Sequence, residues 1–160
     1  MKPLLAATFL FIASSATPAL AATCSASSSG VALGVYRPNQ ATPADSAGLV
    51  TVTCSREVLE TFPVTVNYSV DFSRGNSTNY SPREMTSGTN KLQYNLYSDA
   101  SRASVWGDTT GGTAHATGSI GLQSVMVPVS ASHTVYGRIF SSQNAVPGNY
   151  ADSIVVTIVY

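Results

Sequence analysis

Apolar and polar residues alternate along most of the chain, a pattern that predicts β-strands rather than helices. The clearest stretch is 64–72, in which every second residue is valine, tyrosine or phenylalanine. Comparable strand signals occur at 31–36, 49–54, 92–97, 122–129 and 134–140. Clusters of glycine, serine and asparagine separate them, and 111–118 is expected to be a flexible connection. About seven short strands with long loops favour one antiparallel β-sandwich.

The last segment, from Tyr150 to Tyr160, is expected to be a strand with two apolar faces. One face consists of Ile154, Val156, Ile158 and Tyr160. The other face consists of Val155, Thr157 and Val159. A strand of this kind is expected to be covered on both faces and to have a neighbour along each edge. We expect no later segment to pair with its far edge, so that edge is left to an earlier segment or to another polypeptide.

Residues 1–21 have the pattern of a signal peptide for export. Lys2 gives a positive start, an apolar run follows, and small residues end at Ala21. The apolar run is too short to span a bilayer with margin. We expect cleavage after Ala21, which leaves residues 22–160 as one domain. The first cysteine does not stand at the cut itself, so the pattern argues against a lipid anchor.

Two cysteines, Cys24 and Cys54, follow the signal. In an exported chain an even number of cysteines predicts a disulfide, which here would be Cys24–Cys54. Two free buried thiols are the alternative. By the loop-closure argument, a bond that closes about 30 residues would stabilise the domain by roughly 3–4 kcal/mol.

Charge and reactive side chains argue against several classes of function. After the signal, seven basic and eight acidic residues remain, without a basic cluster that could bind nucleic acid. His115 and His133 could be combined with aspartates and serines into a triad, but no serine lies in a nucleophile motif. The same histidines lack the spacing of metal ligands. We therefore expect no enzyme, no catalytic residue, no metal and no small-molecule cofactor.

Short motifs spread over nearly all of the chain after the signal carry a family resemblance. The early ones are Cys24 with the segments 31–36 and 50–54. Later ones occur at 92–99, 101–102, 105–108, 135–139 and 147–152. In this order they resemble the spore coat protein U domain family. The motif residues, for which we expect structural roles, are Tyr94, Asn95, Leu96, Tyr97, Asp99, Trp106, Gly107, Asp108, Tyr136, Gly137, Gly148, Tyr150 and Asp152.

That family contains spore coat proteins and subunits of archaic chaperone–usher pili. The resemblance implies an incomplete immunoglobulin-like β-sandwich that lacks its last strand. A periplasmic chaperone, and later a neighbouring pilus subunit, would supply that strand by β-strand addition. We expect the accepting groove to be lined by Val31, Leu33, Val35, Ile154, Val156, Ile158 and Tyr160.

The resemblance also implies partners and a location. A pilus subunit would pass through the periplasm and an outer-membrane usher to the cell surface, with roles in adhesion and biofilm formation. Only Ala22 and Thr23 are expected between the signal and Cys24, too few to form a donor strand, which favours a tip or terminal subunit. One alternative is a self-complete, spore-coat-like or secreted cell-surface protein. Another is a glycan-binding module that uses Trp106 and exposed tyrosines.

Overall fold

The computed structural model describes residues 22–56 and 63–160, and the regular elements of this part are all β-strands. The expected signal peptide, residues 1–21, lies outside the described residues. The strands are β1 (Ala22–Ser28), β2 (Ala44–Arg56), β3 (Val64–Phe72), β4 (Arg83–Ser87), β5 (Asn90–Tyr97), β6 (Ala116–Leu122), β7 (Val129–Ile139) and β8 (Val156–Val159). Over these residues, the structure has no helix with the length and apolar character needed to cross a membrane.

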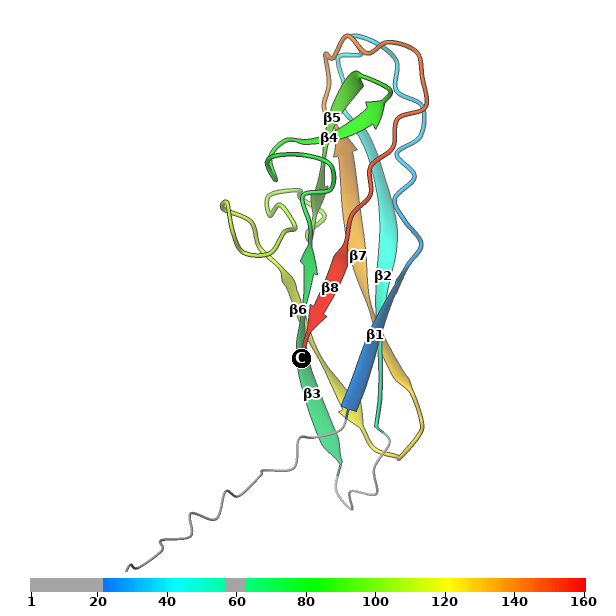
Figure 1. The fold of residues 1–160 in the computed structure, drawn as a ribbon, viewed down its shortest axis with the longest axis vertical. Coiled ribbons are helices and arrows are strands. Elements are labelled where there is room, and N and C mark those ends of the chain that lie inside the picture. Colours follow the sequence, from blue (N-terminus) through cyan, green and yellow to red (C-terminus); the bar gives the residue numbers. More distant parts are fainter. Residues whose placement is uncertain (1–21, 57–62) are drawn as a thin grey trace, which may run out of the picture.

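The strands form two antiparallel sheets. A five-stranded sheet has the order β1-β2-β7-β5-β4, and a three-stranded sheet has the order β6-β3-β8. Figure 1 shows them as the layers of an elongated sandwich, with β8 beside β3. Within the described part of the chain, β8 lies at a sheet edge and pairs with β3 alone. The expected fold class, an all-β, immunoglobulin-like antiparallel sandwich, is confirmed.

Alternate residues of β3 form the centre of the core, because strand geometry places them on one face. They are Val66, Tyr68, Val70 and Phe72. Trp106, from the loop after β5, is fully buried. Its ring stacks on Phe72 with the centroids 4.4 Å apart, and its Nε1 donates to the Val70 carbonyl at 2.7 Å. The glycan-binding alternative is therefore wrong in its use of Trp106, whose ring no ligand can reach.

Three of the strand expectations are wrong in detail. Segment 31–36 is not a strand, because Gly30 and Gly34 have φ angles of 70° and 76°, outside the range of extended backbone. The final strand is limited to Val156–Val159, and residues 150–155 are irregular apart from a single bridge. Residues 123–128 form a loop between β6 and β7 instead of continuing a strand.

Sequence patterns also missed β1, β4 and β6. The first three residues of β6, 116–118, belong to the glycine-rich segment 111–118 for which a flexible connection is expected. In the structure Gly118 is needed there, since a side chain at this position would collide with the hydroxyl of Tyr68. β4 begins with Arg83, a fully buried charged residue that interrupts the alternation of apolar positions.

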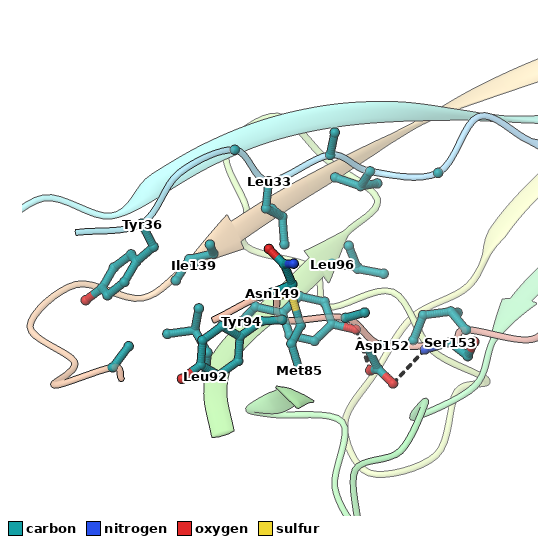
Figure 2. A pocket seen from close by; sticks show the side chains of 18 of the residues that line it. Leu33, Tyr36, Met85, Leu92, Tyr94, Leu96, Ile139, Asn149, Asp152 and Ser153 are labelled. Carbon is teal, nitrogen blue, oxygen red and sulfur yellow. Dashed lines mark hydrogen bonds between the residues drawn. The ribbon is translucent and has the colours of Figure 1, made fainter. Parts of the chain in front are cut away.

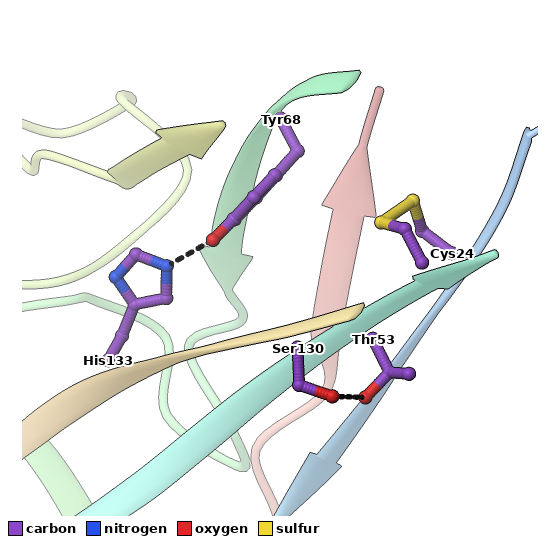
Figure 3. The surroundings of a disulfide bond; sticks show 6 residues. Cys24, Thr53, Tyr68, Ser130 and His133 are labelled. Atoms are coloured by element: carbon purple, nitrogen blue, oxygen red, sulfur yellow. Dashed lines mark hydrogen bonds between the residues drawn. A yellow bond between two sulfur atoms is a disulfide. The ribbon is translucent and has the colours of Figure 1, made fainter. Parts of the chain in front are cut away.

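The Cys24–Cys54 disulfide joins β1 to β2 (Figure 3). The two cysteines stand directly opposite each other in the antiparallel pair, with their Cα atoms 4.1 Å apart. Cys54 is fully buried in the core. The bond therefore fixes β1 at the edge of the five-stranded sheet, near the start of its pairing with β2, which runs from Ala22 to Ser28.

Loss of this disulfide is expected to destabilise the domain. Replacing Cys24 and Cys54 together by alanine frees a separation of 30 residues in the unfolded chain. The free energy of unfolding should fall by about 3 kcal/mol, as measured by denaturant unfolding followed through Trp106 fluorescence. The control replaces Thr51 and Ser132 together by alanine; their exposed hydroxyls are 3.0 Å apart across β2 and β7. It should cost less than about 1 kcal/mol, and equal losses would contradict the prediction.

Candidate functional site

A long groove of about 980 Å³ lies between two segments of irregular backbone (Figure 2). Wall A is the segment 30–36, which follows β1. Wall B is the segment 145–154, which leads into β8. The floor between them belongs to the five-stranded sheet. The groove therefore lies beside the edge of β8 that has no partner strand among the described residues.

The floor of the groove is apolar and aromatic. Leu92, Tyr94 and Leu96 are alternate residues of β5, so they project from the same face of the sheet. Met85 of β4 and Ile139 of β7 lie beside them, and all five side chains are buried. In Figure 2 these floor residues face the same space as Leu33 of wall A. A segment that enters the groove would therefore bury apolar side chains against the floor.

Wall A lies close against two glycines of the sheet. A Cβ atom on Gly137 would be 2.7 Å from the side chains of Val31 and Leu33. A Cβ atom on Gly48 would collide with the backbone carbonyl of Gly30. Gly137 and Gly48 have no side chains, and the space that side chains would fill at these two positions is occupied by wall A.

Wall A uses little of its own backbone for hydrogen bonding. The Ala32 carbonyl accepts from the Ser46 hydroxyl at 2.6 Å. None of the N–H groups of residues 31–36 donates to another residue of the described chain. Backbone polar groups need water or a hydrogen-bond partner, because burying them unpaired is unfavourable. Wall A therefore has the free backbone groups that an additional strand could use.

Wall B is held at one point by backbone pairing. Ala151 and Thr86 of β4 exchange two backbone hydrogen bonds of 2.9 and 3.1 Å. Between residues 146 and 150, no backbone N–H donates to another residue that the structure describes. Tyr150 donates its hydroxyl to the Val146 carbonyl at 2.8 Å, a bond that stays within the wall. Wall B thus also leaves backbone groups free beside the groove.

The carboxylate of Asp152 fastens wall B to the floor. It accepts a hydrogen bond of 2.6 Å from the Tyr94 hydroxyl and one of 2.8 Å from the backbone N–H of Asn76. Burial, together with the Asp152 carboxylate, raises the pKa of Tyr94 well above its usual range. The hydroxyl therefore remains a donor, and the floor keeps its position against wall B.

Arg83 links the floor to the core, and the sequence pattern had not singled it out. The side chain is fully buried. Its guanidinium donates to the Asn95 side-chain oxygen at 2.7 Å and to the carbonyls of Trp106 and Ser73 at 2.6 and 3.0 Å. Burial lowers the pKa of Arg83 from its usual value. A lone arginine gives no periodic signal, so only the structure could reveal that motif residues 95 and 106 share this partner.

Other motif residues shape loops. Hydrogen bonds from the Ser101 hydroxyl and nearby backbone N–H groups lower the pKa of Asp99 to about 2. Hydrogen bonds from the hydroxyls of Thr110 and Tyr80 likewise lower the pKa of Asp108 to about 2. Both carboxylates thus bind loop groups. Motif residues that pack against neighbouring strands or loops are Tyr97, Gly107, Tyr136 and Gly148.

The structure places most, but not all, of the expected groove residues in the groove. Those that line it are Val31, Leu33, Val35, Ile154 and Val156. Ile158 and Tyr160 are outside its lining. The floor residues of β4, β5 and β7 were not expected as groove residues, because in the sequence they are indistinguishable from core.

The opposite face of the last segment is open to solvent. Val155 and Val159 on this face are 65% and 56% exposed, and Tyr160, at the end of the other face, is also 56% exposed. The expectation that both faces of this strand are covered is therefore wrong within the described chain. Only the face that carries Ile154 and Val156 packs against the core.

The two histidines each contact one residue of β3. The Nδ1 of His115 is 3.0 Å from the carboxylate of Asp71. The Nε2 of His133 is 2.9 Å from the hydroxyl of Tyr68 (Figure 3). Among the residues that the structure describes, no cluster of three or more histidine, cysteine, aspartate or glutamate side chains could hold a metal ion.

Comparison with known proteins identifies relatives of this chain. The model of the Spore Coat Protein U domain family matches residues 8–157. Protein U of Myxococcus xanthus is 29% identical over 132 residues, which are 79% of this chain and 69% of Protein U.

A solved structure shares the fold. It is the CsuC-CsuE chaperone–tip adhesion subunit pre-assembly complex from archaic chaperone-usher Csu pili of Acinetobacter baumannii. One of its chains matches with a TM-score of 0.53 and 20% identity. The match covers 87% of this chain but 40% of that chain, so this chain spans less than half of that protein's length.

The seat of wall A can be tested with one methyl group. In Gly48→Ala the new methyl should displace wall A, because it would collide with the Gly30 carbonyl. The free energy of unfolding is expected to fall by about 1–3 kcal/mol in denaturant titrations. In the control, Gly121→Ala, the nearest atom is 3.5 Å from the new Cβ, so a change within about 0.5 kcal/mol is expected. Equal effects would show that close packing at Gly48 is not what holds wall A.

Proposed function

Because the chain belongs to the Spore Coat Protein U domain family, we propose that it is an exported structural subunit of a chaperone–usher pilus and that its groove accepts a β-strand from another polypeptide. The observation that carries the proposal is a groove with an apolar floor between two walls of free backbone. Backbone hydrogen bonds would give affinity, and alternate side chains on the floor would give specificity.

The shape of the groove supports an extended segment as its occupant. Leu92, Tyr94 and Leu96 are spaced by two residues along β5, the repeat with which a strand presents its side chains. A strand in the groove could pair with the free edge of β8 and wall B on one side and with wall A on the other. It would complete the three-stranded sheet and cover the floor at once.

The family gives the proposed partners their identity. A periplasmic chaperone would supply the first strand, and a neighbouring pilus subunit would replace it after passage through an outer-membrane usher. We propose that residues 1–21 direct export, that residues 22–160 form the domain, and that the pilus acts in adhesion and biofilm formation. This function is structural and involves no catalytic step.

A tip or terminal position is supported by the pairing of β1. If the signal is removed after Ala21, two residues remain before Cys24. Both are already paired in β1, Ala22 opposite Arg56 and Thr23 opposite Ser55. They are not available as a donor strand, so the mature chain would accept a strand without giving one.

The proposal is tested by producing residues 1–160 in a bacterial periplasm with and without the cognate chaperone. We expect low soluble yield of the lone chain and rescue as a one-to-one complex on size exclusion. A soluble, cooperatively melting monomer with no affinity for the chaperone would contradict the proposal and favour a self-complete coat or surface protein.

A matched pair of variants places the contact in the groove. Val146 in wall B and Val127 in the loop before β7 are half exposed, at 52% and 51%. Val146→Glu would put a carboxylate beside the incoming strand and should weaken the complex at least about tenfold. Val127→Glu should leave affinity unchanged. Equal weakening by both variants would show that the chaperone does not bind through the groove.

A further inference from the structure

The groove ends where its two walls are tied directly to each other. The segment after wall A and the segment before wall B exchange backbone hydrogen bonds, Asn39 N–H to the Gln143 carbonyl at 2.9 Å and Ser142 N–H to the Gln40 carbonyl at 2.8 Å. Tyr36 adds to this link, because its hydroxyl accepts from the Gln143 N–H at 2.8 Å and donates to the Gln143 carbonyl at 3.3 Å. We call these contacts the brace.

The brace leaves no room for a strand. Chains joined by backbone hydrogen bonds lie about 4.8 Å apart, whereas two walls with a strand between them must be about 9.6 Å apart. At Asn39 and Gln143 the direct bonds put the two segments one strand spacing apart. The groove, which extends to Tyr36, Pro38 and Ala145, is therefore blocked beyond that point.

The side chain of Gln143 anchors the brace to the floor strand. Its Oε1 accepts from the Gln93 N–H at 2.7 Å. Its Nε2 donates to the carbonyls of Gln93 and Phe140, both at 2.9 Å. The brace is thereby connected to β5, the strand that supplies most of the floor. Ser142 has a φ of 61°, an unfavourable conformation for serine that a well-anchored loop can maintain.

The floor alone does not select a single register for an incoming strand, whereas a closed end can. If an incoming strand slips by one residue, its apolar face turns away from the floor, which is strongly unfavourable. A slip by two residues keeps the apolar face in place. Leu92, Tyr94 and Leu96 present a large, mainly apolar side chain at each such step, so the floor discriminates weakly between these registers. A fixed stop at one end would select one of them.

We propose that Tyr36 and Gln143 are positioning residues that close this end of the groove and fix the register of the accepted strand. The inference rests on the proposed strand acceptance and adds which register the accepted strand takes. The ligand is an extended peptide with alternating apolar residues, whose end abuts the brace.

Cross-linking can measure the register directly. Val35 lines the groove and is 88% exposed, and both native cysteines are in the disulfide, so Val35→Cys adds one reactive thiol. The probe is a designed peptide in which valine alternates with threonine, made in versions that each carry one cysteine in place of a different threonine. After oxidation of the two thiols by dissolved oxygen, mass spectrometry would quantify the disulfide formed between each version and the protein. With the brace intact, one version should be preferred over its neighbours by about tenfold or more.

Two variants in this background test the brace. Tyr36→Phe removes the hydroxyl but keeps the ring, and Gln143→Ala removes the anchor to β5. Either should reduce the preference between neighbouring versions to about threefold or less, because the backbone bonds of the brace lose a side chain that holds them in place and can open, so that the strand slips by two residues. If Gln143→Ala does not fold, the milder Tyr36→Phe decides the question. The control is Tyr68→Phe, which removes a hydroxyl that bonds His133 outside the groove lining and should preserve the preference.

The outcomes separate the two proposals. If the brace variants bind the peptide with the same preference as the parent, strand acceptance stands and the register inference is overturned. If no version binds or cross-links to the parent, strand acceptance itself is overturned, and the register inference falls with it. A preference that is lost in both brace variants and kept in Tyr68→Phe supports the inference.

Discussion

Backbone hydrogen bonding is the constraint on which the rest of the structure depends. Beside the groove, the N–H groups of residues 31–36, 146 and 148–150 have no acceptor within the described chain. The apolar floor favours collapse of the walls onto it, because collapse removes hydrocarbon surface from water. Collapse would bury unpaired backbone groups, which is unfavourable unless they find partners. The groove is thus a balance between these two effects, and a strand placed in it would satisfy both.

Polar anchors hold this balance open, and each acts at a different place. Arg83 joins the loops behind the floor through carbonyl and amide acceptors. Asp152 fixes wall B to Tyr94, and Gln143 fixes the end of both walls to β5. Hydrogen bonds fix both the distance and the direction between two groups, whereas apolar contacts are non-directional and constrain distance less closely. The anchors therefore define the width of the groove, while the apolar floor supplies the surface that an occupant would cover.

The sequence predicted the parts of this fold that depend on simple alternation. The expected strand at 64–72 is β3 to the residue, because its inward side chains are all apolar and its outward ones polar. Prediction failed where backbone conformation or a polar side chain decides the structure. Because φ is positive at Gly30 and Gly34, the apolar stretch between 30 and 36 forms wall A instead of a strand. In β4, the buried Arg83 interrupts the alternation of apolar residues, so the sequence pattern does not predict this strand. From the sequence, only the walls of the groove could be predicted, because its floor residues have the same pattern as residues of the hydrophobic core.

Two glycines show that the position of the groove depends on residues of the sheet as well as on residues of the walls. Gly48 and Gly137 lie inside strands, where glycine is less favourable than residues that pack a side chain. Neither has a positive φ, so conformational freedom does not explain them. Their role is space: at both positions a Cβ would meet wall A. Because Gly137 has no side chain, Val31 and Leu33 can pack against its backbone, and this glycine therefore determines the position of wall A and hence one side of the groove.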